Sequence, residues 1–123
     1  SLLQTSDIIS LHLPLNEKTR HIIHAGTIAR MKDGDILINA SRGAIVDEAA
    51  AYEALLNGKL GGLGLDAFEA EPPTGSKLLK LENVVATPHT GAHTEEAVRN
   101  MQSLSVQNLI DVLSGNPCRF VVC

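Results

Sequence analysis

The 123-residue sequence has few aromatic residues, few cysteines and no excess of positive charge. It contains no tryptophan, and its formal net charge is -4. A nucleic-acid-binding surface needs clustered basic residues and aromatic rings on which bases stack, and both signatures are missing. No apolar run approaches the roughly 18 residues that a membrane-spanning helix needs. We therefore expect neither a nucleic-acid partner nor a membrane partner.

Cysteine is scarce as well. Both cysteines, Cys118 and Cys123, stand at the end of the sequence, which is not the pattern of a disulfide framework. We expect free thiols in a reducing compartment, and this predicts a cytoplasmic location. We expect no metal site, because no well-spaced cysteine or carboxylate set completes the pair that His89 and His93 would form.

What remains is the composition of an ordinary globular domain, with 44% hydrophobic and 20% charged residues. Short apolar segments alternate with helical ones. The predicted strands are Asp7–Leu13, Asp35–Ala40, Gly62–Phe68 and Val84–Thr87. The predicted helices are His24–Met31, a segment from Asp47 to Gly58, and Thr94–Leu113. This alternation predicts βαβ units and an α/β fold, with a parallel sheet covered on both faces.

The helical segments carry recognisable boundaries. Acidic residues in the first turn favour a helix beginning at Asp47, and Ala51, Leu55 and Leu56 form its predicted apolar face. Gly34 stands where the residue after a helix end belongs. The chain starts at Ser1 and enters a strand pattern almost at once, so we expect it to be part of a longer protein.

In a parallel sheet, ligands bind outside the carboxyl ends of the strands. Three residues near these ends suit catalysis. Arg42 follows the second predicted strand, and a guanidinium there can bind a carboxylate through two parallel hydrogen bonds. His89 follows the fourth strand and can exchange a proton near neutral pH. Glu71 follows the third strand, and a carboxylate beside an imidazole favours the imidazolium.

Each of these residues also has an ordinary interpretation, as a solvated charge in a loop. His89 and Glu71 lie 18 positions apart, and the sequence does not show that they touch. Among the other histidines, we expect His12 to be packed inside a strand. His21 and His24 flank a predicted helix start, and we expect both to be solvated.

Four segments resemble motifs of the D-isomer-specific 2-hydroxyacid dehydrogenases, and they occur in the same order. The residues from Asn39 to Glu48 resemble the stretch around that family's catalytic arginine. The other three segments are Asp66–Pro72, Asn83–Ala92, and His12–Leu15 followed by Thr19. Together they cover nearly the whole chain. D-3-phosphoglycerate dehydrogenase is among the members of this family that it most resembles.

The resemblance implies catalytic roles for three residues. Arg42 would hold the substrate's carboxylate and carbonyl, His89 would be the general acid and base, and Glu71 would pair with His89. The implied cofactor is NAD, with NADP left open. The residues that would contact it are Leu13, Pro14, Ala40, Ser41, Arg42, Asp66, His89, Gly91 and Ala92.

The resemblance also implies a domain organisation. The glycine-rich G-x-G-x-x-G turn of the family's cofactor domain does not occur in this sequence. Residues 1–115 would therefore be the C-terminal half of a doubly wound, Rossmann-like NAD-binding domain. Residues 116–123 would begin the return to an absent substrate domain. The longer protein would be a homodimer.

Three hypotheses about function stay open. The first is an oxidoreductase that transfers a hydride between NAD(P) and a small D-2-hydroxy or 2-keto acid. The second is a dehydrogenase-like module that senses the cofactor or binds a partner without turnover. The third is that the isolated chain is inactive and self-associates, because half of a doubly wound domain leaves a sheet edge and an apolar face uncovered.

Overall fold

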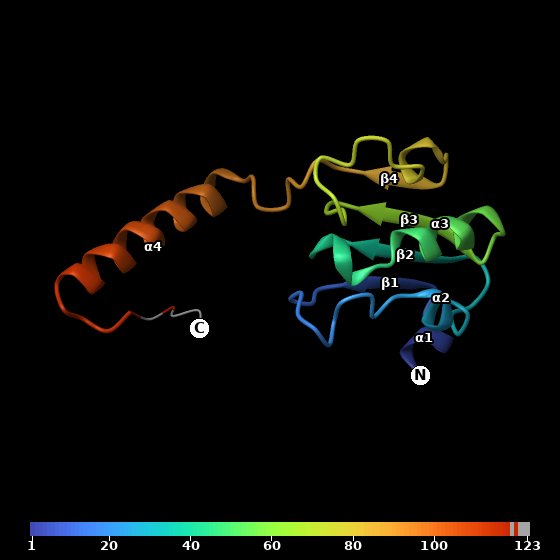
Figure 1. Ribbon diagram of the computed structural model, residues 1–123, viewed down its shortest axis with the longest axis horizontal. Coiled ribbons are helices and arrows are strands. Elements are labelled where there is room, and N and C mark those ends of the chain that lie inside the picture. The colour runs from blue at the N-terminus through green and yellow to red at the C-terminus, as the bar shows by residue number, and fades with distance from the viewer. Residues whose placement is uncertain (119, 121–123) are drawn as a thin grey trace. The chain divides into compact units, whose positions relative to one another are not determined.

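A computed structural model describes residues 1–118 and 120, which divide into two compact units, residues 1–90 and the described residues from 91 onward. The first unit holds a four-stranded parallel sheet with the order β1-β2-β3-β4 (Figure 1). The strands are β1 (Ile8–Leu11), β2 (Asp35–Asn39), β3 (Leu60–Leu65) and β4 (Val84–Ala86). The predicted α/β class and parallel sheet are confirmed. Of the predicted return segment, residues 116–123, residues 119 and 121–123 lie outside the described residues.

Two helices, α2 (Ala25–Ile28) and α3 (Glu48–Leu56), lie on one face of this sheet. Successive strands are neighbours and are all parallel, so the chain moves across the sheet in one direction. Crossovers between parallel strands are right-handed, and such a path keeps its helices on a single face. A second helical layer needs strands beyond β1, where the order of the sheet would reverse.

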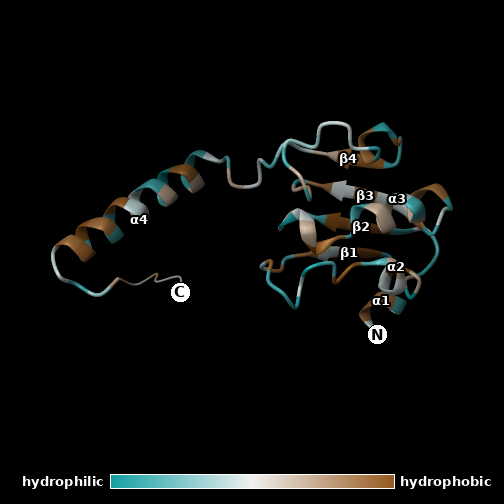
Figure 2. Ribbon diagram, viewed as in Figure 1, coloured by the Kyte–Doolittle hydropathy of each residue, from teal (hydrophilic) through white to brown (hydrophobic). Residues whose placement is uncertain are grey.

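Burial alternates along the strands because only one face is covered within this unit. Ile9, Leu11 and Leu37 point into the core under the helices. Ile36 and Ile38 on the other face are 40% and 37% exposed. Figure 2 shows β2 largely in the brown of hydrophobic residues. The prediction of a sheet covered on both faces is therefore wrong for the unit itself, and the expectation of an uncovered apolar face is met.

The predicted elements exist, most of them with shorter bounds, and β3 begins two residues earlier and ends three residues earlier than predicted. The Asp47 side chain caps α3 by accepting a hydrogen bond from the Ala50 N–H at 3.0 Å. Leu56 does not belong to the apolar face of α3, because it is 56% exposed while Ala54 is buried. Helix α2 ends at Ile28, well before the glycine that was expected to follow its end.

Three short elements were not predicted. They are the single turn α1 (Leu2–Thr5) and the 3-10 turns η1 (Gly43–Ile45) and η2 (Leu78–Lys80). Each is too short to show a helical period in the sequence. The first 3-10 turn directly follows Arg42 and is fully buried, so it anchors the loop that carries this residue.

The second unit contains α4 (Glu95–Leu113). Its N-cap is Thr94, whose hydroxyl accepts a hydrogen bond from the Ala97 N–H at 3.1 Å. Two glutamates in the first turn oppose the helix macrodipole, as predicted for this segment. Among the described residues, no helix combines the length and the apolar character that crossing a membrane requires.

Candidate active site at the carboxyl ends of the strands

The loop after β2 is held by a buried amide. Asn39, the last residue of β2, is fully buried and follows the apolar residues 36–38 of the strand. Its Nδ2 donates to the carbonyl oxygen of Arg42 at 2.9 Å, and its Oδ1 accepts from the Ser41 N–H at 3.1 Å. Buried polar groups are almost always paired in this way. The two bonds fold the backbone over the end of β2 and so determine where Arg42 leaves the sheet.

Ser41 connects this loop to the end of β1. Its hydroxyl donates to the carbonyl oxygen of Leu11 at 2.6 Å and accepts from the Leu13 N–H at 3.3 Å. Leu13, Pro14, Ser41 and Arg42 line a surface cavity of about 530 Å³. The Arg42 guanidinium donates to the Ser41 carbonyl oxygen at 2.8 Å. Four of the predicted cofactor-contacting residues therefore lie around one cavity.

Glu71 and His89 meet across the ends of β3 and β4. The Nδ1 atom of His89 lies 3.0 Å and 2.9 Å from the two carboxylate oxygens of Glu71. The Phe68 N–H donates to the same carboxylate at 3.0 Å. His89 has a positive φ of 54°, a left-handed conformation that non-glycine residues adopt at an energetic cost. This strained turn, closed by the His89 N–H bond to the Thr87 carbonyl oxygen at 3.0 Å, brings the imidazole to the carboxylate.

The carboxylate of Glu71 is stabilised in its ionised form. Its hydrogen bond to His89, followed by the bond from the Phe68 N–H, lowers the pKa of Glu71 below the ordinary value. Burial and the nearby charge of Asp66 oppose this shift. At neutral pH the pair therefore consists of a carboxylate and a histidine whose Nδ1 is already engaged. The remaining ring nitrogen, Nε2, is the atom that can exchange a proton with a ligand.

Asp66 ties the two loops together. Its Oδ1 accepts from the Thr87 hydroxyl at 2.5 Å and from the Thr90 N–H at 2.8 Å. Because Asp66 follows β3 and both threonines flank His89, these bonds fix the turn after β4 against the end of β3. A carboxylate predicted to contact a cofactor thus also holds the turn that carries His89.

The dyad borders a second cavity of about 320 Å³ with mostly apolar walls. Phe68, Pro88 and Leu79 are among the residues around it, together with Glu71 and His89. The predicted site residues therefore form two groups on the same edge of the sheet, one around Arg42 and one around His89. An apolar wall beside a proton-exchanging group suits a small organic ligand.

Other predicted residues lie apart from these groups. Ala40 directly follows β2 and is exposed. Gly91 and Ala92 belong to the second unit, so the structure does not assign them to either cavity. Cys118, for which a free thiol was predicted, is free and partly buried, and Cys123 lies outside the described residues.

Two histidine predictions are wrong. His12 lies beyond the end of β1 and is exposed, with its Nε2 2.8 Å from the Ser10 hydroxyl. The apolar residues around it suggested a longer strand than the one that forms. His21 is half-buried rather than solvated, and it lies 3.2 Å from Glu69.

Sequence reasoning missed the residues that hold the site. Asn39 had a visible signal, because it is a polar residue directly after the apolar run of residues 36–38. Thr87 and Thr90 had none, since their bonds to Asp66 join positions more than 20 residues apart. In the described part of the chain, no three histidine, cysteine or acidic side chains converge as metal ligands would.

Comparison with known proteins identifies the family to which this chain belongs. The family described as the NAD-binding domain of D-isomer-specific 2-hydroxyacid dehydrogenases matches residues 1–91. The chain is 56% identical over 104 residues to a hydroxypyruvate reductase of Thermotoga maritima, covering 82% of this chain and 34% of that protein. It is 46% identical over 121 residues to a D-3-phosphoglycerate dehydrogenase of Methanocaldococcus jannaschii, covering 98% of this chain and 23% of that protein.

A solved structure agrees with the sequence relatives. The D-lactate dehydrogenase of Aquifex aeolicus, solved with NAD and lactic acid, superposes with a TM-score of 0.87 at 37% identity. The match covers 94% of this chain and 39% of that one. The chain therefore spans about a quarter to two-fifths of the length of these proteins. By sequence and by fold, it belongs to the NAD-binding-domain family of the D-isomer-specific 2-hydroxyacid dehydrogenases.

Proposed function

We propose that the protein transfers a hydride between NAD(P) and a small D-2-hydroxy acid or 2-keto acid. The observation that carries this proposal is the pairing of His89 with Glu71 at the carboxyl edge of the sheet. A carbonyl that accepts a hydride at carbon must receive a proton at oxygen, and the dyad supplies that proton. The activity is proposed for the protein in which this chain is joined to the segments that its relatives possess.

His89 is proposed as the general acid and base. Glu71 occupies Nδ1, so Nε2 donates a proton to the carbonyl oxygen during reduction and removes it from the hydroxyl during oxidation. Glu71 keeps the ring oriented and stabilises the imidazolium that forms in the oxidation direction. Each turnover of reduction consumes one proton through this nitrogen, and oxidation returns it.

Arg42 is proposed to bind the substrate's carboxylate and carbonyl oxygen. A guanidinium binds a carboxylate through two parallel bonds, which orient the substrate as well as neutralise it. It also stabilises negative charge that develops on the carbonyl oxygen. The Asn39 bonds that hold the Arg42 backbone support this role, because orientation requires a fixed loop.

The residues near β1 and β2 fit a nicotinamide cofactor. Leu13 and Pro14 offer an apolar wall to a flat ring, and Ser41 offers a hydroxyl to its polar substituent. Asp66, Ala40, Gly91 and Ala92 are proposed to complete the contacts with the cofactor. When bound, the cofactor supplies or accepts the hydride. NAD is proposed as the cofactor, with NADP as the second possibility.

The test is a turnover assay of the protein with NADH or NADPH and a panel of 2-keto acids. Consumption of the reduced cofactor that is lost in Arg42→Ala and His89→Ala supports the proposal. Binding of NADH without turnover of any 2-keto acid overturns it, and favours the module that senses a cofactor or binds a partner. Cofactor binding, measured by fluorescence, distinguishes a variant that fails in the reaction from a variant that does not fold.

The organisation of the protein is part of the proposal. Residues 1–115 are proposed as part of the NAD-binding domain, with residues 116–123 as the start of a return segment. The protein is proposed to be a cytoplasmic homodimer, and the isolated chain to be inactive. Sedimentation of the protein tests the homodimer, and a monodisperse monomer would contradict it. A turnover assay of the isolated chain tests its proposed inactivity.

A further inference from the structure

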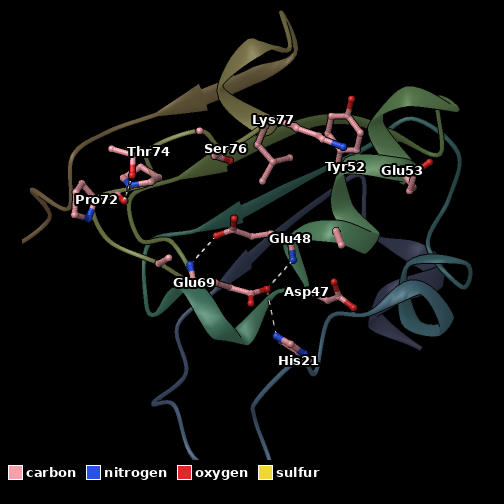
Figure 3. Close-up of a pocket in the computed structure, with 15 residues that line it drawn as sticks. His21, Asp47, Glu48, Tyr52, Glu53, Glu69, Pro72, Thr74, Ser76 and Lys77 are labelled. Carbon is pink, nitrogen blue, oxygen red and sulfur yellow. Dashed lines mark hydrogen bonds and ion pairs between the residues drawn. The ribbon is translucent and has the colours of Figure 1, made fainter.

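The loop after β3 carries two glutamates that face different partners. Glu71 contacts His89, whereas Glu69 contacts the first turn of α3 and His21 (Figure 3). Only one residue separates them in the sequence. The proposed function uses Glu71 and leaves the contacts of Glu69 without a purpose.

Glu69 and Glu48 exchange hydrogen bonds in both directions. The Glu48 N–H donates to the Glu69 carboxylate at 2.9 Å, and the Glu69 N–H donates to the Glu48 carboxylate at 2.6 Å. Bonds from backbone N–H groups to ionised carboxylates are short and stronger than neutral ones. Because each side chain holds the other's backbone, the loop and the start of α3 are fixed in one register. Figure 3 shows the two side chains reaching across to each other.

His21 adds a third contact from a separate segment. Its Nε2 lies 3.2 Å from the Glu69 carboxylate, at ion-pair distance but without the geometry of a hydrogen bond. The backbone of His21 is fixed by its N–H bond to the Ala44 carbonyl oxygen at 2.8 Å. It has a positive φ of 48°. A strained backbone persists only where the surroundings hold it, so this segment is a firm support for Glu69.

The backbone next to Glu69 is also packed against the loop of Arg42. A Cβ atom added to Gly43 would lie 1.8 Å from the Phe68 carbonyl carbon and 2.4 Å from the Glu69 nitrogen. Gly43 therefore lets the two loops touch directly. The Phe68 N–H, one residue before Glu69, donates to Glu71. A shift of Glu69 would move this donor and the backbone beside Arg42 together.

We propose that Glu69 is a positioning residue, which acts through Glu48 and His21 to hold the Phe68–Glu71 turn against His89. The inference rests on the proposed function, because it assigns Glu69 to the same reaction. Glu69 does not touch the reacting atoms. It fixes the positions of the Phe68 N–H and of the Glu71 carboxylate, and this carboxylate orients the His89 imidazole.

The electrostatics of the cluster agree with this geometry. Burial, followed in part by the nearby charge of Glu69, raises the pKa of Glu48. The bond from the Glu69 N–H acts in the opposite direction and favours the ionised form. Asp47, Glu53 and Lys77 also border this cavity, and the His21 imidazole lies beside the Glu69 carboxylate. The Glu48 and Glu69 carboxylates lie close together, and the backbone N–H bonds that each accepts stabilise this arrangement.

The experiment compares Glu69→Ala with Glu69→Gln in the native protein. Glutamine keeps an oxygen that accepts the Glu48 N–H, so it preserves position and removes only charge, whereas alanine removes both. Glu53→Ala is the matched control, since Glu53 borders the same cavity on α3 and takes no part in these bonds. The readouts are kcat, KM, the pH profile of kcat/KM, and the titration of the Glu71 carboxyl group by carbon NMR.

We expect Glu69→Ala to lower kcat about tenfold, within the hundredfold that a misplacement of roughly 1 Å can cost. The pKa of Glu71 should rise toward its ordinary value, because the Phe68 N–H and His89 no longer hold it as well. Removing only a neighbouring negative charge would lower that pKa instead. Glu69→Gln should therefore keep kcat within about twofold of the native protein and show no upward shift, as rescue by a conservative variant requires.

Three results would overturn the inference. They are an unchanged Glu71 titration in Glu69→Ala, a downward shift in both Glu69 variants, and an equal loss of kcat in Glu69→Ala and Glu53→Ala. The NMR titration does not depend on turnover. Absence of turnover in the native protein, together with the expected titrations, would therefore reject the proposed reaction and retain the positioning of Glu71.

Discussion

In the part of the chain that the structure describes, two histidine–glutamate pairs share one loop. His89 lies 2.9 Å from Glu71, and His21 lies 3.2 Å from Glu69. Both histidines have a positive φ, at 54° and 48°. The pairs nevertheless differ in what else the glutamate holds. Glu71 binds the backbone of its own turn at Phe68, while Glu69 binds the backbone of α3.

This difference separates chemistry from support. The His89 pair is hydrogen-bonded through Nδ1, lies at the carboxyl edge of the sheet and leaves a ring nitrogen for a ligand. The His21 pair lacks hydrogen-bond geometry and lies beside the start of α3. Under the proposed function, the same two residue types serve a reaction in one pair and a scaffold in the other, and the hydrogen-bond geometry distinguishes the two.

The largest expected effect comes from replacing each histidine in turn by asparagine. Asparagine tolerates the left-handed backbone, so both variants keep the local fold. His89→Asn should lower kcat by about a hundredfold to ten-thousandfold, the usual contribution of a general acid or base. His21→Asn should lower kcat by less than about tenfold, because it acts only through Glu69. Steady-state assays with a 2-keto acid measure both.

A third variant controls this comparison. His12→Asn changes an exposed histidine near the end of β1 that bonds to Ser10, and it should leave kcat unchanged. Equal losses in His21→Asn and His89→Asn would remove the distinction between the two pairs. Circular dichroism of each variant separates a lost reaction from a lost fold.

The next effect tests the backbone contact that supports both glutamates. Gly43→Ala places a Cβ 1.8 Å from the Phe68 backbone, which has no flexible side chain that could move aside. We expect a loss of about 3 kcal/mol in the free energy of unfolding, at the upper part of the range for overpacking. Urea denaturation measures it.

Gly64→Ala is the matched control for that change. Its Cβ would meet Ile38 side-chain atoms at 3.7 Å, an ordinary contact on the uncovered face of the sheet. We expect a change within about 0.5 kcal/mol, because nothing must shift. Similar losses at Gly43 and Gly64 would mean that the sheet resists any added side chain, and that the loop contact has no special importance.

The fold could be anticipated because its signals are local. Apolar β-branched runs and capping residues such as Asp47 and Thr94 lie within single segments of the sequence. The alternation of strands and helices was enough to predict a parallel sheet. The composition of strands such as Asp35–Asn39 suits burial on both sides and gave no sign of the uncovered face. That face was expected only from the resemblance to half of a doubly wound domain.

The candidate site could be anticipated only in part. Arg42, Glu71 and His89 stand out because they follow strand ends. The hydrogen bonds that position these residues join distant segments, such as the bond from the Thr90 N–H to Asp66. No periodic pattern in the sequence indicates such pairs. Glu69 is the clearest case, since its sequence neighbours suggest a solvated loop and its partners lie on other elements. Tertiary contacts of this kind are fixed by the fold rather than by local propensity.

The smallest effect concerns the pH dependence of stability, and here the two glutamate clusters should differ in sign. The pKa of Glu71 is lowered by its bonds to His89 and to the Phe68 N–H. Its stabilising contribution is therefore present above the ordinary pKa of glutamate and is lost as pH falls through the lowered pKa. Relative to the native protein, Glu71→Gln should be less stable at neutral pH, and this difference should close in acid.

Glu48 should show the opposite trend, because burial raises its pKa. A raised pKa gives a contribution that is present below the ordinary value and is lost as pH rises through the raised one. Glu48→Gln keeps an oxygen for the Glu69 N–H, so it should gain stability relative to the native protein as pH rises toward neutrality. Urea denaturation from about pH 3 to about pH 7 measures both variants. Parallel slopes for the two would contradict the contrast, because they would place both carboxylates in the same electrostatic environment despite their different partners.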